Sequence, residues 1–439
     1  MIRKILLGFI CIIFLSNDVL AAELIAKGDV LNLQQCIEIA LSKHPNINAA
    51  TSTIRITDSK IGQARAGYYP QLTFQSSYQR IGPSSYQRID PSPTSIINTD
   101  PYNQYSNTLS LSQTIFDFGK TYNQVQIQSL GKESSQADLQ DITEQVILGV
   151  KQAYYGYLKA KMSRDVALET VNQFQQHYEI AKVFFETGKS SKIDVTSAEV
   201  NLSNAKINLL KAENALRIAK ITLTNAMGII NAAEYEIKDE LAYRPYEVSL
   251  EEALQNAYKN RPDLLSTLKK KEGLEKTIDL NKKGYFPVLS GSAAYGYYGD
   301  TGNDLVMDKE WSVGVTLTFP LFTGLSTKYQ VDEAKANLDV LKANEDLLMQ
   351  KVYLQVESAY LSLKEAAERI SAGKIIVKQA EETVELAKGR YSAGVGSSIE
   401  ITDAMITLNN AKMTYITALS DYSVAQANLE KAMGAGAQK

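Results

Sequence analysis

Residues with the chemistry for catalysis are few in this chain of 439 residues. It contains two histidines, His44 beside a predicted helix break and His177 inside a predicted long helix. Neither belongs to a nucleophile elbow, a metal-ligand cluster or a phosphate-binding loop in the sequence. We therefore expect both imidazoles to lie at the surface, and we predict a protein that is not an enzyme and uses no cofactor or metal.

Three carboxylates have more distinctive surroundings. Asp194 follows a turn that contains Gly188, and Glu400 and Asp403 follow a turn that contains Gly394. An acidic residue at the start of a helix is ordinarily explained by the helix macrodipole. Carboxylates that are brought close together would instead attract cations and raise one another's pKa. Which explanation holds depends on how the surrounding helices position these three carboxylates.

The N-terminal segment has the pattern of a secretory signal peptide. A basic pair precedes an apolar run over residues 5–15, and Ala21 and Ala22 supply small residues for cleavage. The run is too short to span a membrane as a helix. We predict a signal peptide over residues 1–22, and its removal leaves Cys36 as the single cysteine, which excludes an intramolecular disulfide. The formal net charge of −3 and the lack of basic tracts argue against nucleic-acid binding.

One short motif occurs twice and reveals an internal duplication. Residues 67–70, Gly-Tyr-Tyr-Pro, return as residues 284–287, Gly-Tyr-Phe-Pro, displaced by 217 positions. Beyond the loop that follows the first copy the displacement falls to 206, and a tandem duplication of residues 76–83 as 84–91 accounts for most of the difference. Such a repeat means one structural unit used twice. A loop that accepts an insertion is exposed, so we expect this one outside the cell.

Alternating apolar and polar residues follow each copy of the motif. In the second repeat Trp311, Val313 and Val315 alternate with Ser312 and Gly314. A period of two, with one apolar face and one uncharged polar face, predicts strands of about ten residues that suit a transmembrane β-barrel. The edge of a soluble β-sandwich is the alternative interpretation of the strands alone.

Two long stretches, residues 121–185 and 327–391, keep apolar residues at spacings of three and four. At 1.5 Å per residue each helix would be about 100 Å long. Two apolar seams on one helix predict that it packs between two neighbours, as in a coiled coil. A turn with glycine and a return helix with alternating small and large residues follow each stretch, so we expect two helical hairpins.

The predicted fold is mixed, an all-α tunnel joined to a transmembrane β-barrel with an internal twofold repeat. Residues 23–228 form the first repeat, 229–249 a linker at the equator, 250–434 the second repeat and 435–439 a tail. The expected elements are helices over 33–66 and 250–283, strands over 69–79, 107–116, 286–297 and 310–319, long helices over 121–185 and 327–391, and return helices over 192–227 and 398–433.

Four strands cannot close a barrel, since single-chain membrane barrels begin at eight strands. An open sheet edge in lipid leaves backbone groups without hydrogen bonds, at a cost of several kcal/mol each. The chain must therefore oligomerise. A trimer would give twelve strands above twelve helical columns and a dimer eight of each, and counting alone does not choose between them.

Taken together, these features resemble the TolC family of outer-membrane efflux and type I secretion channels. The likeness rests on the duplication, the Gly-Tyr-aromatic-Pro junctions, the tip glycines and the helix ends Met227-Gly228 and Met433-Gly434. It implies a homotrimer in the outer membrane of a Gram-negative bacterium, with a 12-stranded barrel continuous with a 12-column periplasmic helical barrel. The implied partners are a periplasmic adaptor (membrane fusion) protein and an inner-membrane pump of the RND, ABC or MFS type. A periplasmic coiled-coil adaptor or structural protein without a barrel is the alternative.

The resemblance also assigns roles to particular residues. The pair Glu400 and Asp403 matches the acidic pair that narrows the family's tunnel entrance, and Asp194 is the single acid of the other tip; these three form the expected periplasmic gate. Gly396 stands where the family has a basic residue that helps to hold the closed state, which puts that lock in doubt. The expected docking tips are Phe185, Gly188, Ser191, Tyr391, Gly394 and Ser397, and the expected junctions between helix and membrane strand are Tyr68, Tyr69, Pro70, Tyr285, Phe286 and Pro287.

Overall fold

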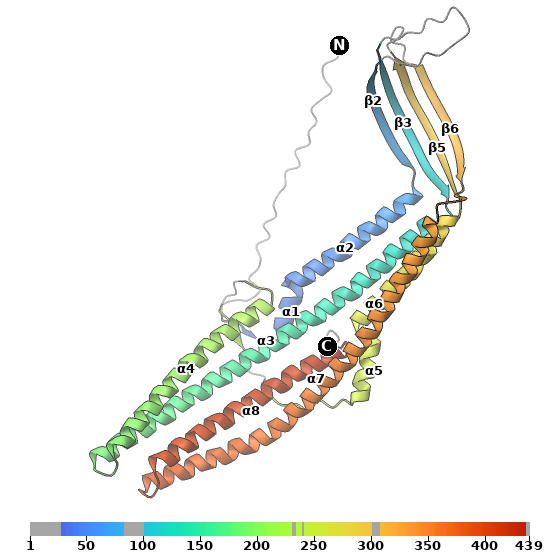
Figure 1. Ribbon diagram of the computed structural model, residues 1–439. Helices are drawn as coiled ribbons and strands as arrows, with labels where there is room; N and C mark the ends of the chain where they lie inside the picture. The colour runs from blue at the N-terminus through green and yellow to red at the C-terminus, as the bar shows by residue number, and fades with distance from the viewer. Residues whose placement is uncertain (1–27, 83–100, 231–233, 239–240, 301–307, 436–439) are drawn as a thin grey trace, which may run out of the picture.

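A computed structural model describes residues 28–82, 101–230, 234–238, 241–300 and 308–435. The predicted signal peptide, the second copy of the tandem duplication at 84–91 and tail residues 436–439 lie outside these ranges. Figure 1 shows an elongated molecule with a β-sheet at one end and two helical hairpins at the other. Among the described residues, no helix is long and apolar enough to cross a membrane.

The two repeats contain matching series of elements with matching lengths. The helices α1 and α5 each have 11 residues, α2 and α6 have 21, α3 and α7 have 67, and α4 and α8 have 35. The first repeat comprises α1 (Leu33–Lys43), α2 (Pro45–Arg65), β2 (Gln71–Ile81), β3 (Tyr102–Phe116), α3 (Lys120–Glu186) and α4 (Lys192–Ala226); the second comprises α5 (Leu250–Asn260), α6 (Pro262–Lys282), β5 (Val288–Asp300), β6 (Asp308–Thr318), α7 (Ser326–Ser392) and α8 (Ser398–Ala432).

The first strand of each repeat begins two residues later than the sequence predicts, at residues 71 and 288. A 3₁₀ turn, Ala66–Tyr68 or Lys283–Tyr285, separates helix from strand, and the proline that follows has no N–H for the sheet. The second strands begin earlier than predicted, β3 at residue 102 and β6 at residue 308, because their pairing with β2 and β5 extends toward the loops.

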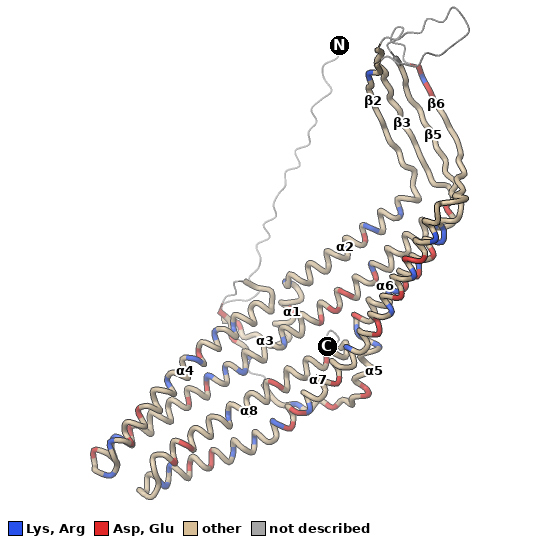
Figure 2. Tube along the Cα trace, viewed as in Figure 1, with Lys and Arg blue, Asp and Glu red and all other residues tan. Residues whose placement is uncertain are grey.

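The sheet has the strand order β2-β3-β5-β6 with antiparallel neighbours throughout. The central pair, β3 and β5, joins the two repeats, with Leu109 opposite Tyr295. The edge strands β2 and β6 have no partner on their outer sides among the described strands. Figure 2 shows charged residues along the helices, whereas the strands carry charge only toward the end farthest from the helices.

The helices form four parallel columns. Two columns are the long helices α3 and α7, and each of the others is two shorter helices placed end to end, α2 with α4 and α6 with α8. The α6/α8 column lies between α3 and α7, while α2/α4 packs mainly against α3 and meets α8 only slightly. Accordingly, α8 buries fifteen residues and α4 only five. The predicted seam of small and large residues is therefore buried along α8 but only in part along α4.

The linker between the repeats contains a short strand that the sequence did not reveal. β4 (Glu236–Ile237) pairs in parallel with β1 (Val30–Leu31), near the start of the described chain. Two buried tyrosines hold the linker: the hydroxyl of Tyr154 in α3 donates to the carbonyl of Lys238 at 2.8 Å, and Tyr422 in α8 donates to the carbonyl of Arg244 at 2.9 Å. A two-residue strand carries too little periodicity to be recognised in a sequence.

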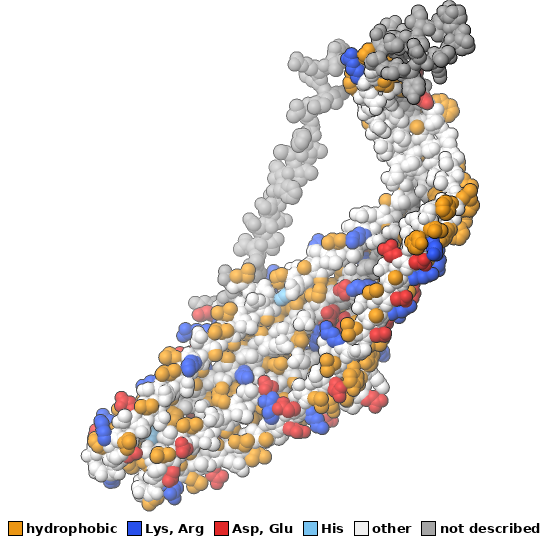
Figure 3. Space-filling model, in the orientation of Figure 1, with side chains coloured by type: hydrophobic (Ala, Val, Ile, Leu, Met, Phe, Trp, Pro, Cys, Tyr) orange, Lys and Arg blue, Asp and Glu red, His pale blue; other side chains and the backbone are white. Residues whose placement is uncertain are grey.

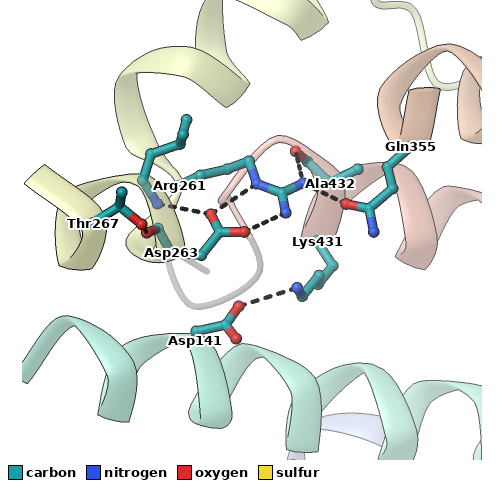
Figure 4. Close-up of polar contacts among 8 residues, drawn as sticks. Asp141, Arg261, Asp263, Thr267, Gln355, Lys431 and Ala432 are labelled. Atoms are coloured by element: carbon teal, nitrogen blue, oxygen red, sulfur yellow. Dashed lines mark hydrogen bonds and ion pairs between the residues drawn. The ribbon is translucent and has the colours of Figure 1, made fainter. Parts of the chain in front are cut away.

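The end-to-end junction of α8 with α6 is held by polar contacts (Figure 4). The Arg261 guanidinium donates twice to Asp263, at 3.0 and 2.6 Å, and to the last helical carbonyl of α8, Ala432, at 3.3 Å. Lys431 forms an ion pair with Asp141 of α3 at 3.1 Å. The junction is tight, since a Cβ on Gly434 would lie 2.8 Å from the backbone of Asn260. These contacts hold the α6/α8 column together where it is interrupted and attach it to the continuous helix α3.

Candidate gate at the hairpin tips

The first hairpin turns between α3 and α4 through a glycine in a left-handed conformation. Gly188 has φ +72°, and the N–H groups of Lys189 and Ser190 donate to the carbonyl of Phe184 at 2.7 and 3.2 Å. This pattern satisfies carbonyls at a helix end and requires a residue that tolerates positive φ. The predicted tip glycine therefore lies where the turn needs it.

The second hairpin turns between α7 and α8 in the same way. Gly394 has φ +76°, and the N–H groups of Val395 and Gly396 both donate to the carbonyl of Arg390 at 3.0 Å. The Ser397 hydroxyl then accepts from the N–H of Glu400 at 3.2 Å and caps α8. Both tips thus use one glycine for the turn and one serine for the new helix.

The three predicted gate carboxylates differ in what they contact. Asp194 accepts from the N–H and the hydroxyl of Ser191, at 3.0 and 2.7 Å, so it completes a capping box. Glu400 and Asp403 are exposed and lie one turn apart at the start of α8. Only the second hairpin therefore presents two carboxylates to solvent, while Asp194 also serves its own helix.

Position 396 is crowded in this turn, so a side chain there would require its neighbours to shift. A Cβ at Gly396 would lie 3.0 Å from both the Cβ of Arg390 and the backbone nitrogen of Tyr391. Arg390 supplies a cation from another position: its Nε donates to Glu400 at 3.1 Å and its terminal nitrogen to the Val395 carbonyl at 3.3 Å. This ion pair lies within one hairpin and is exposed at 56% and 45%. Arg390 is not among the residues predicted from the sequence, although it directly precedes Tyr391.

The predicted docking residues divide into exposed and buried groups. Phe185, Ser191 and Ser397 are exposed, and Lys192 approaches the Phe185 ring at 5.7 Å. Tyr391 is different, because only 6% of it is accessible. Its ring packs against Phe184 at a centroid distance of 5.3 Å and belongs to the core of the tips. Tyr391 therefore lies inside the tips and not on the exposed surface that docking would use.

His177 is also buried, contrary to the expectation that both histidines lie at the surface. It is 2% accessible, and its Nε2 lies 3.0 Å from the hydroxyl of Ser398 on the other hairpin. The spacing from Phe174 and Ala181, both buried on the same helix, is the signal that could have placed it inside. His44 is half-buried and caps α2, where its Nδ1 accepts from the N–H of Asn46 at 3.2 Å.

A series of polar contacts between α3 and α8 joins the two hairpins along their length. From the tip upward these contacts are His177 with Ser398 at 3.0 Å, Thr170 with Asn409 at 3.3 Å, Glu169 with Lys412 at 2.8 Å, Gln152 with Asn428 at 3.0 Å and Lys151 with Glu430 at 2.6 Å. We call this series the α3–α8 ladder. His177 and Ser398 form its lowest rung.

The Gly-Tyr-aromatic-Pro motif of each repeat lies where a helix gives way to the first strand of that repeat. Gly67 and Gly284 bring this turn close to the following long helix, since a Cβ would lie 3.1 Å from Thr121 or 2.8 Å from Thr327. Figure 3 shows hydrophobic side chains gathered at this level. The exposed aromatic residues here include Tyr68, Tyr69, Tyr285 and Phe286. Pro70 and Pro287 follow them, and each directly precedes the first residue of a strand.

Comparison with known proteins places these features in a family context. The family described as outer membrane efflux protein matches residues 36–229 and 253–435. The chain is 23% identical over 428 residues to outer membrane protein TolC of Escherichia coli (strain K12), covering 92% of this chain and 82% of TolC. It is 21% identical over 416 residues to the probable efflux pump outer membrane protein TtgC of Pseudomonas putida, covering 92% and 83%. The crystal structure of the Campylobacter jejuni CmeC outer membrane channel has the same fold, with a TM-score of 0.78 at 19% identity over 92% of this chain and 86% of that one.

Proposed function

Since this chain belongs to the outer membrane efflux protein family, we propose that it is the exit duct of an efflux pump or a type I secretion system. The observation that carries this conclusion is the family match over both repeats, residues 36–229 and 253–435. The predicted resemblance to the TolC family is confirmed. The sheet lies in the outer membrane of a Gram-negative bacterium and the helices extend through the periplasm. The family consists of channels, and the proposed role requires no catalysis.

The proposed duct is a homotrimer. Its support in the sheet is that β2 and β6 are open edges, which in lipid must pair. The internal repeat indicates how. Inside the chain Ser110 of β3 lies opposite Ala294 of β5. The repeat equivalent of Ser110 is Thr316, 206 positions later, and that of Ala294 is Ser77, 217 positions earlier. The same pairing between copies therefore places Thr316 opposite Ser77 of the next copy. Both residues then lie on the uncharged polar face, so the register keeps one face apolar.

The helices support the same ring. On α7 the residues Val340, Leu347, Leu354 and Leu361 recur every seven positions and are all more than half exposed. Their equivalents on α3, displaced by 206, include Ser134, which meets Ser266 at 3.0 Å inside the chain, and Asp141, which meets Lys431. These four residues, the α7 seam, thus correspond to the residues of α3 that contact the α6/α8 column. On α7 the same positions are left exposed.

The surface that would receive this seam is exposed on α4. Leu210 and Ile221 of α4 are 66% and 69% exposed, whereas their repeat equivalents in α8, Ile416 and Ala427, are 4% exposed. The missing neighbour of α2/α4 is therefore proposed to be α7 of the next copy. Three copies are favoured over two by the trimeric state that the TolC family implies.

We propose that the tips form the periplasmic gate of this duct. Threefold symmetry would arrange Glu400 and Asp403 as rings of like charge, which attract cations. Asp194 would contribute the acid of the alternate hairpins, beyond its capping role. Arg390 takes part by neutralising some of the charge of Glu400, with which it forms an ion pair.

The proposed partners are a periplasmic adaptor and an inner-membrane pump of the RND, ABC or MFS type. The exposed tip residues Phe185, Gly188, Ser191, Gly394 and Ser397 would contact the adaptor. Cysteines introduced at Phe185 and Ser397 should cross-link to the adaptor in cells, with Tyr243 at the equator as the comparison position. Cross-links confined to the equatorial cysteine would contradict docking at the tips.

The duct itself is tested by reconstituting the purified full-length protein into planar bilayers and measuring its mass in detergent. Stepwise, cation-selective currents from a species with three copies are expected. A monomer that gives no currents, or a protein soluble without detergent, would contradict the proposal and favour a periplasmic structural protein.

A further inference from the structure

The lowest rung of the α3–α8 ladder is the one contact in this series that contains a histidine. His177 lies on α3 of the first hairpin and Ser398 is the first residue of α8 in the second hairpin, and they are 2% and 7% accessible. Their hydrogen bond therefore joins two separate hairpins through side chains that solvent hardly reaches. Separation of the hairpins at the tips would break it.

The surroundings of His177 suit a neutral imidazole. Its ring meets the edge of the Tyr391 ring at a centroid distance of 5.5 Å. In the described part of the chain neither the Nδ1 of His177 nor the hydroxyl of Tyr391 has a hydrogen-bond partner. An imidazolium donates from both nitrogens, so protonation would leave a buried donor and a buried charge without an acceptor.

Each neighbouring element contributes differently to the electrostatics of this histidine. On α4, Asp194 is the carboxylate whose charge acts on the ring and favours its protonation. On α7 and α8, Arg390 and Glu400 are paired with each other. Burial outweighs the effect of Asp194 and lowers the pKa of His177 below its ordinary value.

We propose that His177 and Ser398 form a proton-sensitive latch, which holds the two hairpins of one chain together while the imidazole is neutral and releases them when it takes up a proton. Released hairpins expose the ring to water, where the imidazolium is well solvated. The inference rests on the proposed gate only for its consequence, the opening of the duct. The latch itself concerns the contact between hairpins.

The direction of the pH effect follows from linkage. The latched state favours the neutral ring, whereas an imidazole in water has a pKa of about 6.5. The latch is therefore at full strength above about pH 6.5 and weakens as the pH falls from that value toward the lower pKa of the latched state. One proton changes the equilibrium between latched and released states by at most about tenfold per pH unit.

The latch is present only within one copy, because the equivalent contact between copies has no histidine. The equivalents of His177 and Ser398, displaced by 206 positions, are Thr383 on α7 and Lys192 on α4. In the proposed ring these two would meet between neighbouring copies, and neither carries a group that titrates near neutral pH. Acid would therefore loosen alternate contacts around the tip, namely those inside each copy.

The distance between the hairpin ends measures the latch directly. Glu186 and Ser392, the exposed last residues of α3 and α7, are replaced by cysteine and labelled with nitroxides in the full-length protein, diluted with unlabelled copies. Cys36 is buried, and burial raises the pKa of its thiol to about 12, so it should not react with the label. Double electron–electron resonance is recorded at pH 7.5 and pH 5.0.

We expect the distance distribution to shift toward longer separations at pH 5.0, and we expect H177Q to abolish this shift. The matched controls H44Q and E144Q remove the other histidine and a buried carboxyl that titrates in the same range, and both should retain it. H177N serves as the second non-titrating variant should H177Q fail to fold. A wild-type distribution that is the same at both pH values, or a shift that persists in H177Q or H177N, would overturn the latch.

Bilayer currents recorded from unlabelled protein at the same two pH values separate the latch from the gate. A distance shift without any change in current would contradict the gate assignment and leave the latch intact. An unchanged distance would contradict the latch whatever the currents do.

Discussion

Glu144 and Gln350 occupy the same position in the two repeats, 206 residues apart, yet Glu144 is 1% accessible and Gln350 is exposed. Glu144 faces the junction where α8 meets α6, near Lys431 and Arg261. Gln350 lies on α7, the helix proposed to face the next copy. A carboxyl is thus present on the side enclosed by the chain, and a neutral amide on the side left open.

Glu144 should make stability depend on pH. Burial raises its pKa to about 7, and it outweighs the opposing effects of Lys431 and Gln140. The folded state therefore favours the protonated form. Its contribution is fully present below the unfolded pKa of about 4.3 and is lost as the pH rises toward 7. Glu144→Gln should leave stability at pH 4 unchanged and raise it by about 3 kcal/mol at pH 8.

The measurement for Glu144→Gln is denaturant unfolding of the detergent-solubilised protein at both pH values. Glu382→Gln at an exposed position of α7 is the control for the loss of a surface carboxylate, and it should have little effect. An equal gain for Glu144→Gln at pH 4 and pH 8 would contradict a titrating group at this position.

The proposed register between copies predicts a specific disulfide. Cysteines at Ser77 and Thr316 should form covalent links between neighbouring copies on mild oxidation, because each residue lies opposite the other on the polar face. A closed ring of three gives products up to a covalent trimer and none larger, as seen by non-reducing electrophoresis. The pair Ser77 and Val315 is the control, since a shift of one residue points the two side chains to opposite faces.

Removal of the tip carboxylates should change ion conduction. Glu400→Ala combined with Asp403→Ala should raise the single-channel cation conductance or weaken the block by divalent cations, because a cation-binding ring is lost. Arg390→Gln frees the charge of Glu400 and should strengthen that block instead. Planar-bilayer recordings at low salt, where screening is weak, measure both. Currents unchanged in both variants would show that the two acids act only at the start of their own helix.

Gly434 should be intolerant of any side chain. It has φ +70°, and a Cβ would lie 2.8–2.9 Å from the backbone of Asn260 and Arg261. Gly434→Ala should therefore destabilise the protein by about 1–3 kcal/mol. Gly389→Ala is the matched control, because that site is helical and open and alanine there should stabilise by about 0.5–1 kcal/mol. Denaturant unfolding compares the two, and equal effects would contradict a backbone cause.

Much of this architecture follows from periodic patterns in the sequence. The duplication, the long helices and the hairpins were predictable because apolar spacing over many residues leaves few alternatives. The strand starts at residues 71 and 288 were missed by two positions because a 3₁₀ turn has no such pattern. The gate acids remain a prediction, since no described contact tests their role.

The errors concern single residues whose environment depends on another helix. His177 and Tyr391 were expected at the surface, but α3 and α7 bring them together in the core of the tips. The role of Arg390 does not follow from the sequence, because its partner Glu400 lies across a turn whose shape is set by Gly394. A sequence gives the types of such residues and not their neighbours.

The equal helix lengths in the two repeats place both hairpin tips at the same distance from the sheet. An inserted residue would move everything beyond it by 1.5 Å along the axis and rotate it by about 100°. Over the 67 residues of α3 or α7, a single such change would displace one tip and turn its buried seam away from its neighbours. Length variation in this protein is therefore expected in the loops beyond the sheet, or in both repeats at once, so that both tips still end at one level.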